Sequence, residues 1–184
     1  MLSKILGGIV LVVAAISLWG VWQAHKANGS IEAANKRVLV ANQAIERAMV
    51  LYKQLFSEET LGKFPSNRAE VVPKAKQAAD LLTSAAQEYR AAADQLDVGR
   101  KTITDDTVAK YWEILATSFR QRADSKEQAT AMLLLFTDPT VTTLDQFTAK
   151  INPLAEKIQK AAKDADASTA EANKIKTENA SRFE

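Results

Sequence analysis

The stretch VVPKAKQAADLLTSAAQEYRAAADQL, residues 71–96, decides the fold. Its apolar residues recur at alternating intervals of three and four, which predicts one buried face of a long α-helix. Half of the positions on this face are alanine, and Ala79, Ala86 and Ala93 widen the alanine row. Gly99 follows at a place that fits the residue just beyond a helix end. The positions of the face are Val71, Ala75, Ala78, Leu82, Ala85, Tyr89, Ala92 and Leu96.

The preceding segment has the same pattern. Between residues 30 and 57, larger apolar side chains alternate with alanine along one face of the helix. The exception is the last position of the alanine row, which is Leu55. Helices that face each other with alanine can approach more closely than helices that face each other with leucine, since the distance between axes follows side-chain size. We therefore predict helices at about 30–57 and 67–98 that form a closely packed antiparallel hairpin. The positions are Ile31, Ala34, Val38, Ala41, Ile45, Ala48, Tyr52 and Leu55.

A third helix is predicted at about 104–137, but charges interrupt the middle of its apolar stripe. Arg120, Arg122, Asp124 and Lys126 stand between Phe119 and the apolar end of the helix. Two interpretations are open for Arg120, Arg122 and Asp124: a polar site inside a bundle, or side chains that alternate outward and pair on the surface. We favour surface pairing, because exposed ion pairs along helices are the more common arrangement.

The end of the third helix is apolar on all sides. A helix of this kind has to be buried or held against a partner protein. We therefore take five residues as candidate protein contacts. They are Met132, Leu133, Leu134, Leu135 and Phe136.

A fourth helix is predicted at about 143–180, with Pro153 either bending it or restarting it. Beyond Ala161 its core positions become small and its surface strongly polar, so we expect this part to project past the other helices or to fray. Four long helices joined by short turns are typical of an up-down-up-down arrangement. The predicted fold is all-α: one N-terminal transmembrane helix followed by an antiparallel four-helix bundle with alanine-rich heptad seams.

The N-terminus has the features of a membrane anchor. The 18 residues from Ile5 to Trp22 carry no charge, and about 20 helical residues cross a bilayer core. A cleaved signal peptide is the alternative, but the small residues that cleavage requires are badly placed. We therefore predict an uncleaved anchor at 1–27 and a soluble bundle at 28–184. The anchor residues are Ile5, Val12, Ile16, Trp19 and Trp22.

The orientation of the anchor is only weakly fixed by charge, since basic residues flank both of its ends. A single N-terminal span before one large domain usually acts as a signal anchor, which places the bundle outside the cytoplasm. The expected location is thus the cell membrane, with the bundle in the periplasm. Several bacterial envelope families share this plan, although no motif ties the chain to one of them.

The composition argues against most chemistries. The 184 residues include no cysteine, one histidine (His25) and six glycines, and they lack the glycine-rich loops that bind nucleotides. Asp164–Ser168 resembles the start of a calcium loop, but Thr169 and Ile175 stand where glycine and glutamate are required. Residues 27–184 carry 22 basic and 22 acidic side chains, which gives no reason to expect nucleic-acid binding. We expect no enzyme activity, no metal and no cofactor.

The function expected from the sequence is structural. We predict a non-catalytic, single-pass protein that serves as an accessory or scaffold subunit of a larger membrane protein complex. Its expected partners are the lipid bilayer and an integral membrane protein complex, or further copies of itself through helix packing. The alternative is an extracytoplasmic sensor or ligand-binding four-helix module.

Overall fold

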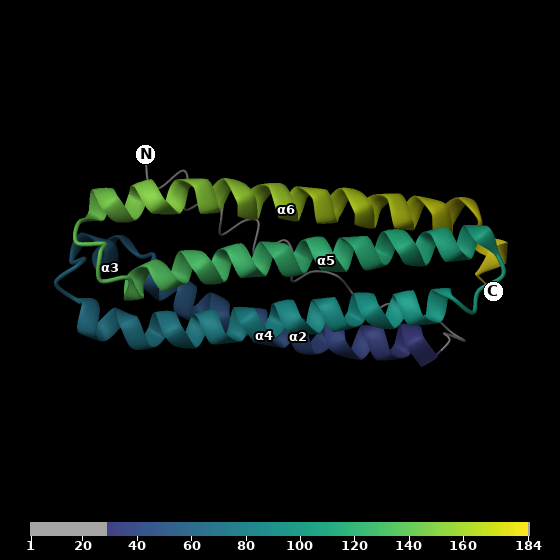
Figure 1. Cartoon of the computed structure of the whole chain (residues 1–184), viewed down its shortest axis with the longest axis horizontal. Coiled ribbons are helices and arrows are strands. Elements are labelled where there is room, and N and C mark those ends of the chain that lie inside the picture. The colour runs from purple at the N-terminus through teal and green to yellow at the C-terminus, as the bar shows by residue number, and fades with distance from the viewer. Residues whose placement is uncertain (1–28, 184) are drawn as a thin grey trace.

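The computed structural model of the chain describes residues 29–183, and every element in that range is a helix (Figure 1). The predicted all-α class is therefore confirmed for these residues. Two short 3₁₀ turns and the short helix α3 lie at the ends of the long helices. The elements are α2 (Gly29–Leu55), α3 (Glu58–Gly62), α4 (Arg68–Arg100), α5 (Asp106–Leu134), η2 (Leu135–Thr137), α6 (Leu144–Glu178) and η3 (Ala180–Arg182).

The predicted membrane anchor lies outside the described residues. This applies to the whole of 1–27 and to the anchor residues named in it. Within residues 29–183, no helix combines the length and the apolar character that crossing a membrane requires. The anchor therefore stays a prediction from the sequence.

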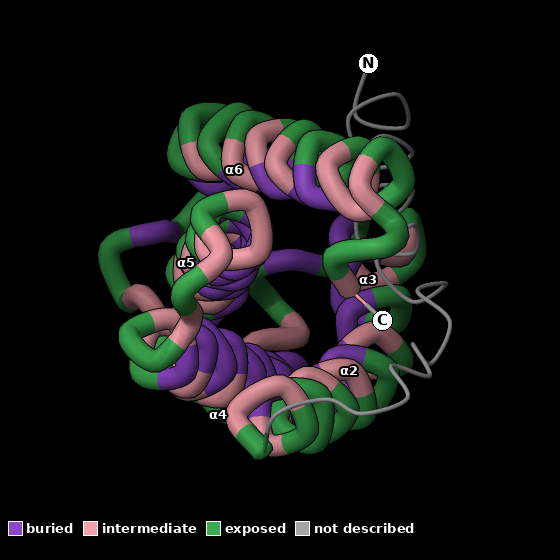
Figure 2. Tube along the Cα trace, turned by 90° about the vertical axis from the view of Figure 1, so that its right-hand side faces the viewer, coloured by how far each residue is buried: buried purple, intermediate pink, exposed green. Residues whose placement is uncertain are grey.

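The four long helices pack as consecutive neighbours. Close packing joins α2 to α4, α4 to α5 and α5 to α6, and the chain curls so that α6 and α2 lie on two sides of a common interior (Figure 2). Among the described elements, α2 and α6 do not form a fourth closely packed pair. Just beyond the end of α2, the ring of Phe56 lies against that of Phe147 of α6, with centroids 6.3 Å apart.

The alanine seam between α2 and α4 matches the prediction. Every predicted seam position of α4 is buried, and so are Ala41 and Ala48 of α2. Tyr89 donates a hydrogen bond from Oη to Asn42 Oδ1 at 2.8 Å, which fixes the antiparallel register of the two helices. The small side chains leave little volume between the axes, so the low aromatic content is compatible with a well-filled core.

Gly99 does not lie beyond the helix end, as the sequence suggested, but inside α4 and buried. A Cβ atom placed on it would lie 2.2 Å from Cζ3 of Trp112 and 2.7 Å from Cβ of Ser30. These distances are far inside van der Waals contact. The glycine is therefore explained by the close approach of three helices, and not by a turn.

The last part of α6 was predicted to project or fray, and that prediction is wrong. Pro153 lies within one continuous helix, and Ala165 and Ala172 remain buried. Beyond α6, Arg182 donates from Nη1 to Asp105 Oδ2 at 2.6 Å. The small residues that suggested fraying instead allow α6 to stay close to α5 over its whole length.

The C-terminal turn holds the end of α6 against the start of α5. The ring of Phe183 packs edge-on against Tyr111 with centroids 5.1 Å apart. We expect Phe183→Ala to lower the free energy of unfolding by about 1 kcal/mol, because an aromatic contact of this kind is lost. Urea unfolding of the full-length chain in detergent measures the change. The Phe183→Tyr variant keeps the ring and serves as the control. Equal stabilities of Phe183→Ala and the wild type would contradict this role.

Candidate functional site: a buried polar cluster

The third long helix, α5, directs a row of polar side chains into the interior of the bundle. Ser118, Arg122 and the adjacent pair Ser125 and Lys126 lie at three successive turns of α5, and all four are buried. Arg122 is 8% exposed and Lys126 only 1%. Charged side chains are rarely buried to this degree unless they are paired. The partners of these two cations therefore decide what the cluster can do.

Arg122 and Ser118 find their partners on α6. Arg122 donates from Nη2 to Asp166 Oδ1 at 3.2 Å and to Thr169 Oγ1 at 3.3 Å. Ser118 donates to the carbonyl oxygen of Ala165 at 3.0 Å and lies 2.7 Å from Thr169 Oγ1. The hydroxyls and the guanidinium thus form one network that ties α5 to α6.

Lys126 lies one turn beyond Arg122 and is in a different situation. None of the ion pairs among the described residues includes it, and its side chain lines a cavity. Burial, helped by repulsion from Arg122, lowers the pKa of Lys126 to about 7, and attraction to Asp166 offsets only part of the two effects. The amine therefore changes its charge near neutral pH, where an ordinary lysine is fully protonated.

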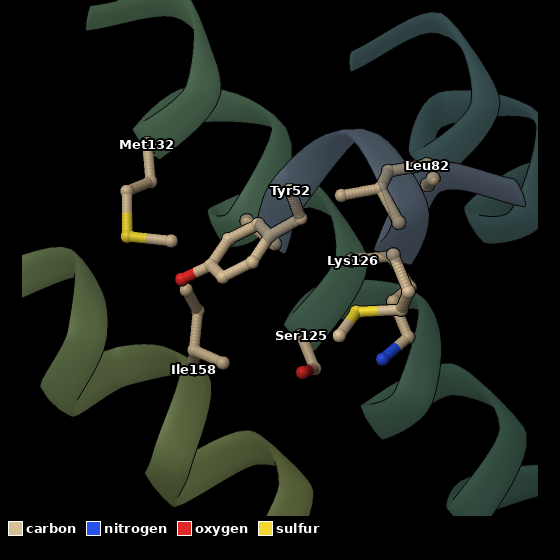
Figure 3. A pocket seen from close by; sticks show the side chains of 9 residues that line it. Tyr52, Leu82, Ser125, Lys126, Met132 and Ile158 are labelled. Carbon is tan, nitrogen blue, oxygen red and sulfur yellow. The ribbon is translucent and has the colours of Figure 1, made fainter. Parts of the chain in front are cut away.

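The cavity lies between α2, α4, α5 and α6 (Figure 3). It offers about 10 Å³ to the centre of a water-sized sphere, close to the space one water needs. Tyr52 Oη and Ser125 Oγ are buried and have no hydrogen-bond partner in the structure. In Figure 3 the ends of Ser125 and Lys126 extend to the same side, while the hydroxyl of Tyr52 reaches toward Met132 and Ile158. The lining residues are Ala48, Met49, Tyr52, Leu82, Ser125, Lys126, Ala129, Met132 and Ile158.

The prediction of surface pairing, made for Arg120, Arg122 and Asp124, is correct for Arg120 and Asp124 and wrong for Arg122. Arg120 pairs with Asp94 at 3.2 Å, and Asp124 pairs with Arg90 at 3.1 Å, both on the surface. Arg122 and Lys126 instead point inward. The sequence contains a pattern that could have predicted the burial of these two residues.

That pattern is the heptad spacing itself. The predicted apolar stripe of this helix runs through Phe119 and Ala123 and resumes at Ala129 or Thr130. A step of three residues from Ala123 reaches Lys126, which the predicted stripe left out. Arg122 lies three residues before Ser125 and seven residues before the buried Ala129. Continuing the repeat through the charged residues would have placed both cations inside.

The five candidate contact residues at the end of α5 divide into two groups. Met132, Leu133 and Phe136 are fully buried in the chain's own core, where Phe136 packs against Phe56, Phe64 and Phe147. Leu134 is 42% exposed, and Leu135 is half-buried. Contact with a partner protein stays a prediction, and its accessible part is this leucine pair.

No group of three or more potential metal-ligating residues occurs within residues 29–183. Comparisons of the chain with protein families, with curated proteins and with solved structures found no match. The function therefore has to be inferred from the sequence and from the geometry of the described helices.

Proposed function

We propose that the chain is a non-catalytic, single-pass membrane protein whose helical bundle serves as an accessory or scaffold subunit of a larger membrane protein complex. In this proposal residues 1–27 hold the bundle at the membrane, on its extracytoplasmic side. The bundle then acts through the surfaces it presents to a neighbouring subunit.

The observation that carries the proposal is an exposed aliphatic face on α2. Leu39 is 54% exposed and Val50 60% exposed, and Val40, next to Leu39 in the sequence, is 47% exposed. Leu39 and Val50 are 11 positions apart, which is about three helical turns and places them on the same side of the helix. Large aliphatic side chains exposed on one side of a helix offer apolar contacts to a partner protein, and polar Gln43 and Glu46 lie between these two on the same side.

The position of this face along the chain supports a partner near the membrane. The first described helix, α2, follows the predicted anchor directly. At about 1.5 Å per residue, Leu39 and Val50 lie roughly 15 Å and 30 Å along the helix from Gly29. A neighbouring membrane protein with a modest extracytoplasmic part can reach both residues. Exposed Glu46 and Arg47 lie between them and would add polar contacts to such an interface.

The proposal is tested with the Leu39→Ser/Val50→Ser variant of the full-length chain. After extraction in mild detergent, we expect the wild type to elute as a stoichiometric complex with membrane subunits, and we expect the double variant to elute as the free chain. Mass analysis of the peak identifies the complex. Val98→Ser is the matched control, since Val98 is 58% exposed on α4, and it should leave the complex intact.

Two outcomes would count against an accessory role. If the wild type elutes as a lone monomer, no stable complex exists under these conditions. If the double variant and the control weaken the complex equally, the face on α2 is not the contact. A complex made only of copies of this chain would favour the homo-oligomer over a hetero-complex.

The alternative role, a sensor or ligand-binding module, makes a different prediction. A ligand that binds the folded chain raises its melting temperature. The cavity beside Lys126 has room for one small group, so an organic ligand would require the helices to separate. A lone monomer stabilised by a small organic molecule would favour this alternative.

A further inference from the structure

The mostly apolar cavity beside Lys126 is also lined by two hydroxyl groups that have no hydrogen-bond partner within residues 29–183. Ser125 Oγ and Tyr52 Oη are buried without partners, and the ammonium group of Lys126 forms none of the ion pairs seen in the described residues. Each unpaired buried polar group costs free energy. Of the three groups, Ser125 and Lys126 extend to the same side (Figure 3), so both would donate to one acceptor placed in the cavity.

The charges around the cavity do not balance. The helix α5 contributes two cations, Arg122 and Lys126, and α6 contributes one carboxylate, Asp166, which pairs with Arg122. From α2 the titratable group is Tyr52. From α4 it is Tyr89, whose hydroxyl already donates a hydrogen bond to Asn42 Oδ1. A protonated Lys126 therefore leaves one positive charge without a counter-charge.

We infer that this cavity binds one small inorganic monovalent anion, of the size of chloride, between the Lys126 ammonium group and the Ser125 hydroxyl, with Tyr52 on the opposite wall. The inference goes beyond the accessory role and does not depend on it. The cavity volume admits a single water-sized group, so a polyatomic anion such as sulfate is too large.

An anion satisfies this site better than water does. A water molecule can accept hydrogen bonds from Lys126 and Ser125, and hydroxyl oxygens can accept its protons in turn, so hydrogen bonding alone does not favour an anion over water. Water leaves the buried positive charge uncompensated. An anion accepts from Lys126 and Ser125 and also neutralises the ammonium group.

The test measures thermal unfolding of the full-length chain in detergent at pH 6.5. Sodium chloride or bromide replaces sodium gluconate at constant ionic strength, so that screening is unchanged and only the anion differs. We expect the melting temperature of the wild type to rise with halide concentration and to saturate. Lys126→Met should remove the response and Ser125→Ala should weaken it. Lys53→Met, at an exposed lysine of α2, should leave it unchanged.

A second measurement does not depend on the variants folding. Crystals grown with bromide are expected to give an anomalous peak beside Lys126 and Ser125. The inference is overturned if Lys126→Met and the wild type respond equally to halide, or if gluconate stabilises the wild type as well as chloride does. A well-diffracting bromide crystal without a peak in this cavity would also overturn it.

Discussion

Replacing Lys126 by methionine is expected to stabilise the protein, by roughly 3–5 kcal/mol at pH 6 in a buffer without small anions. The environment lowers the pKa of this buried lysine from 10.5 to about 7. A pKa that differs by one pH unit between the folded and unfolded states changes stability by about 1.4 kcal/mol. Below pH 7 the folded protein has to hold the charged amine in a dry interior. Methionine fills a similar volume without that cost.

The pH dependence of stability tests whether the buried Lys126 lowers the free energy of unfolding. Between pH 7 and lysine's ordinary pKa, the unfolded chain binds the proton that the folded chain has lost. The free energy of unfolding of the wild type should therefore rise with pH in this window, by up to about 1.4 kcal/mol per pH unit. We expect Lys126→Met to lose this rise. Urea unfolding of the full-length chain in detergent, from pH 6 to 9.5, measures both slopes.

The upper limit of this range is set by the tyrosines. Burial raises the pKa of Tyr52 and raises that of Tyr89 to about 12. Above pH 10 the unfolded chain ionises its tyrosines before the folded chain does, which lowers stability and would hide the effect of the lysine. Lys53→Met is again the control and should keep the wild-type slope. If Lys126→Met unfolds more easily than the wild type at pH 6, the buried amine stabilises the fold and the expected sign is wrong.

The seams of α2 and α4 could be predicted because their periodicity is regular and their composition is simple. Alanine at every seventh position, with larger apolar residues between, has few interpretations other than a closely packed helix pair. The order and direction of the four helices then follow from short connections. The periodicity cannot predict how closely two helices pack when they are not consecutive in the sequence. The helices α2 and α6 are such a pair, and they pack less closely than the consecutive pairs do.

The polar cluster was missed because charged residues are usually exposed, and this general expectation outweighed the heptad position of Lys126. The partners of Arg122 lie 44 and 47 residues away on α6, and no local pattern links them. Ser118, Asp166 and Thr169 are ordinary polar residues in the sequence. Their role depends on the register of α5 against α6, which only the folded structure fixes.

The second half of α6 illustrates the same limit in another way. Its small residues suggested a helix without a partner. In the structure the same residues bring α6 close to α5. A row of small side chains therefore indicates close approach if a partner helix exists and fraying if it does not, and the sequence of α6 alone contains no evidence for either.

Gly99→Ala is expected to destabilise the protein by roughly 2 kcal/mol, although alanine is the better helix former. The change gains about 1 kcal/mol in helix propensity. Against this, the new methyl group would overlap Trp112 and Ser30, and overpacking of a filled core costs up to about 3 kcal/mol. Urea unfolding of the full-length chain in detergent measures the net effect. Gly62→Ala is the matched control, because a Cβ atom there meets nothing within 4 Å.

A double-mutant cycle separates steric overlap from any other effect of the substitution. Trp112→Leu removes the ring atom nearest to the new methyl group, at the cost of a cavity of its own. If overlap is the cause, Gly99→Ala should cost much less in the Trp112→Leu background than in the wild type, with a coupling of about 1–2 kcal/mol. Equal costs in both backgrounds would show that the ring yields freely. Because Gly99 brings together the start of α2, the end of α4 and the first turns of α5, the coupling also measures how rigidly the end of the bundle next to the predicted anchor is held.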